Sequence, residues 1–152
     1  MSSSHQKGRS LLWLAAALLF ASSVAIAIGV IPITGIYNSS YIGPGAMMIM
    51  CWSCLVFSGV AATILACVAA CARKLSLSLG ILLATVMVVA LLFSFGLTDA
   101  AFAFDSRGPA LQTPALFLHF CSGADFVVAL LIVVAVVLLP KRTSGTPTSS
   151  LS

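Results

Sequence analysis

The feature that most constrains this chain is a set of four apolar runs, each long enough to cross a lipid bilayer. The first run, 11–33, holds 23 residues without a charge. A helix that rises about 1.5 Å per residue needs about 20 residues to cross a hydrocarbon core about 30 Å thick. The runs 46–72, 77–102 and 114–139 are of similar length. The sequence therefore predicts an all-α integral membrane protein, folded as a four-transmembrane-helix bundle.

Composition supports lipid as the natural solvent of this single domain. Hydrophobic residues make up 61% of the chain and charged residues 7%, against roughly 25% charged residues in an average soluble domain. The net charge of +4 does not indicate nucleic acid, because the basic residues form no patch. They lie in pairs at the edges of the apolar runs, where they set membrane orientation.

The positions of the basic residues predict that both termini are cytoplasmic. Arg107, close to Asp105, is the one basic residue on the outer side of a four-span arrangement. Cytoplasmic loops carry the excess of Lys and Arg in membrane proteins. Six of the seven basic residues fall on the other side: Lys7, Arg9, Arg73, Lys74, Lys141 and Arg142.

The segments between the runs are short. We expect a cytoplasmic N-terminal tail (1–10), an outer loop (34–45), a cytoplasmic turn (73–76), a second outer loop (103–113) and a disordered cytoplasmic tail (140–152). The basic start and the small residues 21–25 also allow a cleaved signal peptide. The first run is longer than a signal core of about 7–15 residues, which favours a retained helix.

Small residues predict where the helices pack. Close backbone approach drives helix association in lipid, since lipid tails are as apolar as leucine. Gly59 lies beside Ser58 in the second run. A stripe of small residues repeats every four positions in the first run: Ala17, Ala21, Ala25 and Gly29. We expect this stripe to pack inside the bundle, and contact between copies of the chain is the alternative use.

Asp125 is the acid that the sequence places inside a span, since the apolar run 126–139 is too short to cross alone. An aspartate in lipid costs about 2.5–3.5 kcal/mol, so it should face the bundle or water. Structural hydrogen bonding is one interpretation. The other is proton or cation handling, with Asp99 and His119 nearby. His119 precedes Asp125 by six residues, so the two do not share a helical face.

The five cysteines allow several interpretations. The pair Cys51 and Cys54 forms one CxxC without a second pair, which does not make a zinc site. Cys121 belongs at the same end of the bundle, so a disulfide to Cys51 or Cys54 is one option and plain buried thiols are the other. Cys67 and Cys71 lie at the cytoplasmic end of their span, where cysteine is a candidate for palmitoylation or is inert packing.

No motif predicts catalysis. The chain has no glutamate, no paired histidines, no GxSxG elbow and no glycine-rich phosphate loop. We therefore expect no enzyme activity, no bound metal and no cofactor.

The third and fourth runs carry a resemblance. An aspartate in the third run (Asp99) and Phe120-Cys121-Ser122 opening an Ala/Val/Leu-rich fourth run resemble the MARVEL and Casparian-strip superfamily of membrane proteins. The four spans and short tails fit as well, whereas an arginine within the first span and an acidic first loop are missing. The resemblance implies proteins that organise membrane domains, form scaffolds or assist vesicle traffic, and that self-associate.

Two functions follow as expectations. The first is a non-enzymatic tetraspan that scaffolds a membrane domain by lateral helix association. Its partners are membrane lipid and either copies of itself or other membrane proteins, in the plasma membrane or an endomembrane. The second is a small channel or transporter, or a subunit of one, that uses Asp125 together with Asp99.

Overall fold

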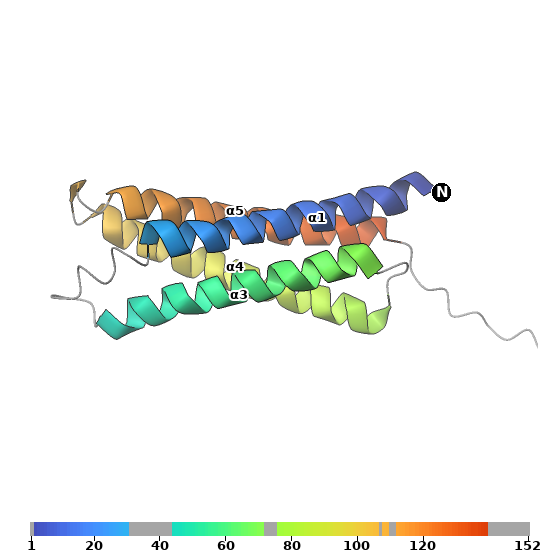
Figure 1. The fold of residues 1–152 in the computed structure, drawn as a ribbon, viewed down its shortest axis with the longest axis horizontal. Helices are drawn as coiled ribbons and strands as arrows, with labels where there is room; N and C mark the ends of the chain where they lie inside the picture. The colour runs from blue at the N-terminus through green and yellow to red at the C-terminus, as the bar shows by residue number, and fades with distance from the viewer. Residues whose placement is uncertain (1, 31–43, 72–75, 107, 110–111, 140–152) are drawn as a thin grey trace, which may run out of the picture.

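The computed structural model describes residues 2–30, 44–71, 76–106, 108–109 and 112–139, and the elements found there are all helical. Four helices are long and apolar enough to cross a membrane, so this part of the predicted fold class is confirmed. They are α1 (Ser2–Ala25), continued by the short π-helix η1 (Ile26–Val30), then α3 (Pro44–Cys71), α4 (Leu77–Asp105) and α5 (Gln112–Leu138) (Figure 1).

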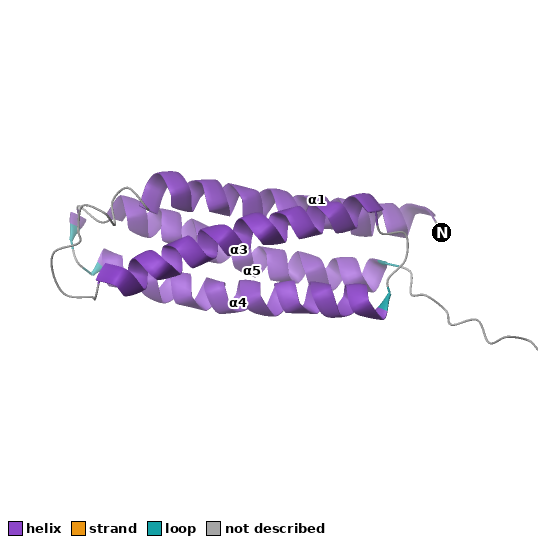
Figure 2. Cartoon of the chain, turned by 60° about the horizontal axis from the view of Figure 1, so that its bottom comes forward, coloured by secondary structure: helices purple, strands orange, loops and turns teal. Residues whose placement is uncertain are grey.

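The helices run up and down along one long axis, so that sequence neighbours are antiparallel (Figures 1 and 2). α5 packs against α1 on one side and α4 on the other, and α1 also packs against α3. Backbone contact between α3 and α4 is sparse. Large side chains join these two helices: the rings of Phe57 and Phe93 stack with centroids 5.0 Å apart.

The buried positions of each helix repeat with a mean spacing of 3.5 residues. Along α1 and into η1, they include a series in steps of four and three: Gly8, Leu12, Ala15, Leu19, Ser22 and Ile26. The same alternation runs along α3: Cys51, Cys54, Ser58, Ala61, Leu65 and Val68. This spacing is the seam of a left-handed helical bundle. Because the helices are apolar all round, small and polar residues mark the seam better than hydropathy does.

α1 begins earlier than its apolar run. The predicted tail 1–10 is helical from Ser2, and contacts at both faces of this turn explain the extension. A Cβ at Gly8 would lie 3.4 Å from the backbone oxygen of Ala135 in α5. Arg9 donates from Nε to Ala69 O (2.6 Å) and from Nη2 to Ala70 O (3.0 Å) at the end of α3. The last carbonyls of a helix lack partners within the helix, and Arg9 supplies two.

The other helix ends follow local chemistry. The Ser76 side chain caps α4 by accepting from Leu79 N at 3.2 Å, as expected for serine at this position. α4 continues to Asp105, past the predicted end at 102. Most of the predicted loop 34–45, most of the turn 73–76 and the tail 140–152 lie outside the described residues.

Candidate functional site

A polar layer divides the interior of the bundle. One apolar cluster, which includes Leu19, Leu65 and Ile132, fills the half toward Arg9. A second cluster, which includes Ile26 and Leu118, fills the half toward His119. Between them lie one buried serine from each helix and one acid, which we call the serine–aspartate layer: Ser22 of α1, Ser58 of α3, Ser94 of α4, and Ser122 and Asp125 of α5.

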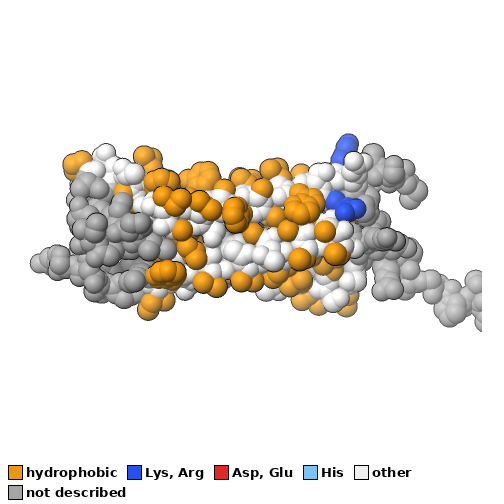
Figure 3. All heavy atoms as spheres, viewed as in Figure 1, with side chains coloured by type: hydrophobic (Ala, Val, Ile, Leu, Met, Phe, Trp, Pro, Cys, Tyr) orange, Lys and Arg blue, Asp and Glu red, His pale blue; other side chains and the backbone are white. Residues whose placement is uncertain are grey.

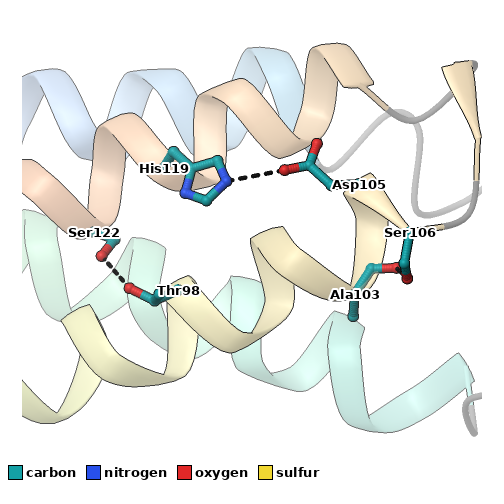
Figure 4. Close-up of polar contacts among 6 residues, drawn as sticks. All are labelled: Thr98, Ala103, Asp105, Ser106, His119 and Ser122. Carbon is teal, nitrogen blue, oxygen red and sulfur yellow. Dashed lines mark hydrogen bonds and ion pairs between the residues drawn. The ribbon is translucent and has the colours of Figure 1, made fainter.

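On the α4–α5 side, the layer is a closed hydrogen-bond network. The Ser94 hydroxyl donates to Ser122 O at 2.9 Å. The Ser122 hydroxyl lies 2.9 Å from Ser94 O and 2.6 Å from the hydroxyl of Thr98 (Figure 4). Because lipid offers no competing partners, such bonds hold neighbouring helices together. The network accounts for the tight pairing of α4 with α5.

On the α1–α3–α5 side, the layer is unsatisfied. Asp125 is 0% exposed, and neither of its carboxylate oxygens has a hydrogen-bond partner. The Ser22 hydroxyl is equally buried and also lacks a partner. Cys121 donates its thiol to Ser22 O at 3.5 Å, and the Cys54 sulfur lies 3.9 Å from the Ser58 hydroxyl.

The antiparallel register of α1 and α5 brings Ser22 level with Asp125. Gly8 lies against Leu138 at one end of this pair, and Gly29 lies against Phe117 at the other. The same register in between sets Ser22 opposite residues 124–125. Asp125 lies at the middle of α5, thirteen residues from both Gln112 and Leu138.

The structure does not bring Asp99, His119 and Asp125 together. Asp99 is exposed on the outward face of α4, one turn from the exposed ring of Phe95. His119 Nε2 lies 3.1 Å from Asp105 Oδ2, near the end of α4 (Figure 4). The His119 ring also packs edge-on against Phe102, with centroids 5.4 Å apart. The side chains of Asp99 and Asp125 therefore do not face one common site in the described structure.

The contact between Asp105 and His119 could not be found from the predicted loop 103–113, which placed Asp105 outside the third span. Helix-dipole preferences gave no signal for it, because they disfavour an acid at the end of a helix, where α4 places Asp105.

The cysteines are free thiols in the structure. Cys51, Cys54 and Cys121 lie in one buried cluster, but the disulfide that the sequence allows is not formed, and Cys121 bonds Ser22 O instead. Cys67 and Cys71 are exposed and line a groove of about 530 Å³ toward the Arg9 end. Their palmitoylation remains a prediction. Among the described residues, no group of three or more His, Cys, Asp or Glu side chains is placed to hold a metal ion.

The small-residue stripe of the first span turns away from the bundle. Ala17 and Ala21 are exposed, Ala25 is half-buried, and Gly29 is buried. A step of four residues advances about 40° around a helix with 3.6 residues per turn, so a four-residue repeat leaves the 3.5-residue seam. Gly29 therefore packs inside the bundle, as predicted for the whole stripe. The prediction is wrong for Ala17 and Ala21, which are exposed. Half-buried Gly59 faces α1, where a Cβ would lie 4.0 Å from Ser23 Oγ.

Comparison with known proteins returns no matching family model, no similar curated protein and no similar solved structure.

Proposed function

We propose that this chain is a non-enzymatic tetraspan membrane protein that organises a membrane domain by lateral association of its helices. The observation that carries the proposal is the outward position of Ala17 and Ala21 on α1. This is also the role that the resemblance of the third and fourth spans to the MARVEL superfamily implies.

The outward face of α1 has the shape that helix association in lipid needs. Trp13 and Phe20 are large and more than half exposed, at 51% and 64%. Ala17 and Ala21 on the same face leave the backbone accessible between these side chains. Small residues four apart let two helices approach closely and gain dispersion contacts. A second copy of α1 can satisfy this face symmetrically, as in most homo-oligomers.

We further propose that the bundle is inserted with both termini in the cytoplasm. Apolar side chains spread along the length of the face viewed, and Lys and Arg side chains gather where α1 begins (Figure 3). Lys7 and Arg9 supply them. The pair of His119 and Asp105 lies at the opposite end. A cytoplasmic Arg9 end agrees with the preference of cytoplasmic segments for basic residues.

Counting subunits in a bilayer tests the association. In Ala21→Leu, a larger side chain fills the notch on α1, so we expect the oligomeric fraction to fall several-fold in single-molecule photobleaching of the labelled full chain. Ala84→Leu is the matched control, since Ala84 is exposed on α4. A monomeric parent protein, or equal effects of the two substitutions, would contradict the proposal.

The second candidate function is a small channel or transporter subunit that uses Asp125. The specific observation in its favour is a fully buried carboxylate without a partner; charged groups within spans are costly and are most often functional. Asp99 has no part in it, because that side chain faces outward. This candidate requires water to reach Cys54 or Cys121, which water-soluble thiol reagents would detect in the native bundle.

A further inference from the structure

We infer that the serine–aspartate layer is a proton-binding site, with the proton on the carboxyl group of Asp125 and the hydroxyl of Ser22 as its partner. Within the part of the chain that the structure describes, three buried side-chain oxygens lack hydrogen-bond partners: both carboxylate oxygens of Asp125 and the hydroxyl oxygen of Ser22. They come from α1 and α5 at the same level. Their coincidence is the observation that needs an explanation.

None of the described basic side chains neutralises the negative charge that an ionised Asp125 would carry. Arg9 bonds the last carbonyls of α3 at the Arg9 end, Lys7 is exposed two residues before it, and His119 is paired with Asp105. An unpaired carboxylate away from water is so costly that such a group takes up a proton instead.

The described side chains around the carboxyl group bring no positive charge that would neutralise it. α1 presents Ser22, α3 presents Cys54 and Ser58, and α5 itself contributes Cys121. α4 contributes buried Ser94 to the same layer, and its hydroxyl is bonded to Ser122 O. The titratable neighbours are therefore thiols, which bring no positive charge.

Protonation also gives the carboxyl group a hydrogen-bond donor. An ionised carboxylate only accepts hydrogen bonds, whereas the protonated form carries one O–H donor. A proton on Asp125 thus supplies an O–H that the Ser22 oxygen can accept across the α1–α5 interface. The serine hydroxyl remains free to donate to the second carboxyl oxygen. As the side chains stand, none of the three oxygens bonds another, so the two side chains must also turn toward each other. One proton taken from bulk water then satisfies all three oxygens and removes the net charge from the interior.

The inference does not rest on lateral association, since it uses only the interior of one bundle. Its test uses the full chain in lipid nanodiscs, with the variant Asp99→Asn/Asp105→Asn. The chain has three acidic side chains and no glutamate, so this variant leaves Asp125 as the only side-chain carboxyl. Both substituted aspartates are exposed, which favours a preserved fold, and circular dichroism checks it.

Infrared absorption gives the readout. We expect a carbonyl stretch of a protonated carboxylic acid at pH 7, where an aspartate in water, with a pKa of about 3.9, is ionised. The band should shift on labelling with ¹³C-aspartate, and it should be lost in Asp125→Asn in the otherwise native chain. That variant keeps the size of the side chain, and the native chain with labelled aspartate gives the same readout if the variant does not assemble.

Three outcomes would overturn the inference. A carboxylate signal alone at pH 7 shows that Asp125 is ionised. A carboxylate signal that changes between sodium and choline buffers shows a metal cation in the layer instead of a proton. An acid band that survives Asp125→Asn places the proton elsewhere.

Discussion

At the scale of single residues, the contact between Gly29 and Phe117 sets the distance between η1 and α5. A Cβ at position 29 would overlap the ring of Phe117. We therefore expect Gly29→Ala to lower the free energy of unfolding by about 1–3 kcal/mol, the usual cost of overpacking. Denaturation by SDS in mixed micelles measures this change.

Gly123→Ala is the control for that substitution. A Cβ at Gly123 would meet no atom within 4 Å, and alanine favours a helix over glycine by up to about 1 kcal/mol. We expect this variant to be as stable as the parent or more stable. Equal losses in the two variants would mean that the Phe117 contact is not what restricts position 29.

The sequence predicted the buried acid of the site but not the side chains that surround it. Asp125 was expected to face the bundle because lipid rejects an acid, and it is fully buried. Its neighbours were not predictable, since Ser22 and Ser58 are ordinary residues in helices that are apolar all round. Only the register of α1 against α5 and α3 brings them level with the acid. The exposed position of Asp99 was not predictable either, because hydropathy does not fix which face of an apolar helix a side chain occupies.

At the scale of elements, Thr98 and Thr85 of α4 differ in one contact: the Thr98 hydroxyl meets the Ser122 hydroxyl of α5. Both threonines donate to the carbonyl four residues earlier in α4, at 2.9 Å. Thr98 also lies 2.6 Å from the Ser122 hydroxyl of α5, whereas Thr85 is exposed. We expect Thr98→Val to destabilise the bundle by about 0.6 kcal/mol or more, as for other hydrogen bonds between membrane helices.

Thr85→Val removes the same atoms without touching another helix, so its unfolding free energy should stay within about 0.5 kcal/mol of the parent value. The difference between the two valine variants isolates the contact between α4 and α5. No difference would show that the network of Ser94, Thr98 and Ser122 adds nothing to this pairing.

Arg9 links α1 to α3 by a different chemistry. Its guanidinium bonds Ala69 O and Ala70 O, where the helix dipole of α3 attracts a cation. Arg9→Met should cost about 1 kcal/mol, near the upper end for an exposed helix terminus. Arg9→Lys should recover only part of it, because an ammonium lacks the planar fork that reaches two carbonyls.

Lys7→Met is the comparison for Arg9, since Lys7 is exposed on the same turn. Removing this lysine should leave the unfolding free energy within about 0.5 kcal/mol of the parent. An equal loss from both methionine variants would indicate a general effect of charge at this end rather than a cap on α3.

The number and type of the helices were predictable, because length and hydropathy decide them, but their ends and faces were not. α1 extends to Ser2 because Gly8 and Arg9 find partners on α5 and α3. Those partners are more than fifty residues away in the sequence. The outward position of Ala17 and Ala21 follows from a 3.5-residue seam, which a stripe of four-residue steps leaves after one or two turns.

At the scale of the whole molecule, the seam between α3 and α4 is the weakest side of the bundle. These helices have few backbone contacts, and the stacked rings of Phe57 and Phe93 bridge them. The two rings stand at the level of the serine–aspartate layer, since Phe57 precedes Ser58 and Phe93 precedes Ser94. We therefore expect loosening of this seam to let water pass from an end of the bundle, along the interior, to Cys54.

Phe93→Ala tests this view of the seam. The aromatic pair contributes about 0.5–1.5 kcal/mol beyond its buried area, and 1.4 kcal/mol corresponds to a tenfold change in the open population. In a Cys67→Ser/Cys71→Ser background, which removes the two exposed thiols, we expect Phe93→Ala to raise the reaction rate of Cys54 with a water-soluble maleimide several-fold.

Phe95→Ala removes the same ring from the outward face of the same helix, where Phe95 is 70% exposed, and it should leave the rate unchanged. If both alanine variants react at the parent rate, water from the bundle ends does not pass along the seam between α3 and α4. The proton on Asp125 would then have to exchange with water along another helix interface, past the apolar cluster of Leu118 or that of Leu19. A tightly packed interface makes this proton exchange slow, whereas a seam held by one aromatic pair lets a single contact set its rate.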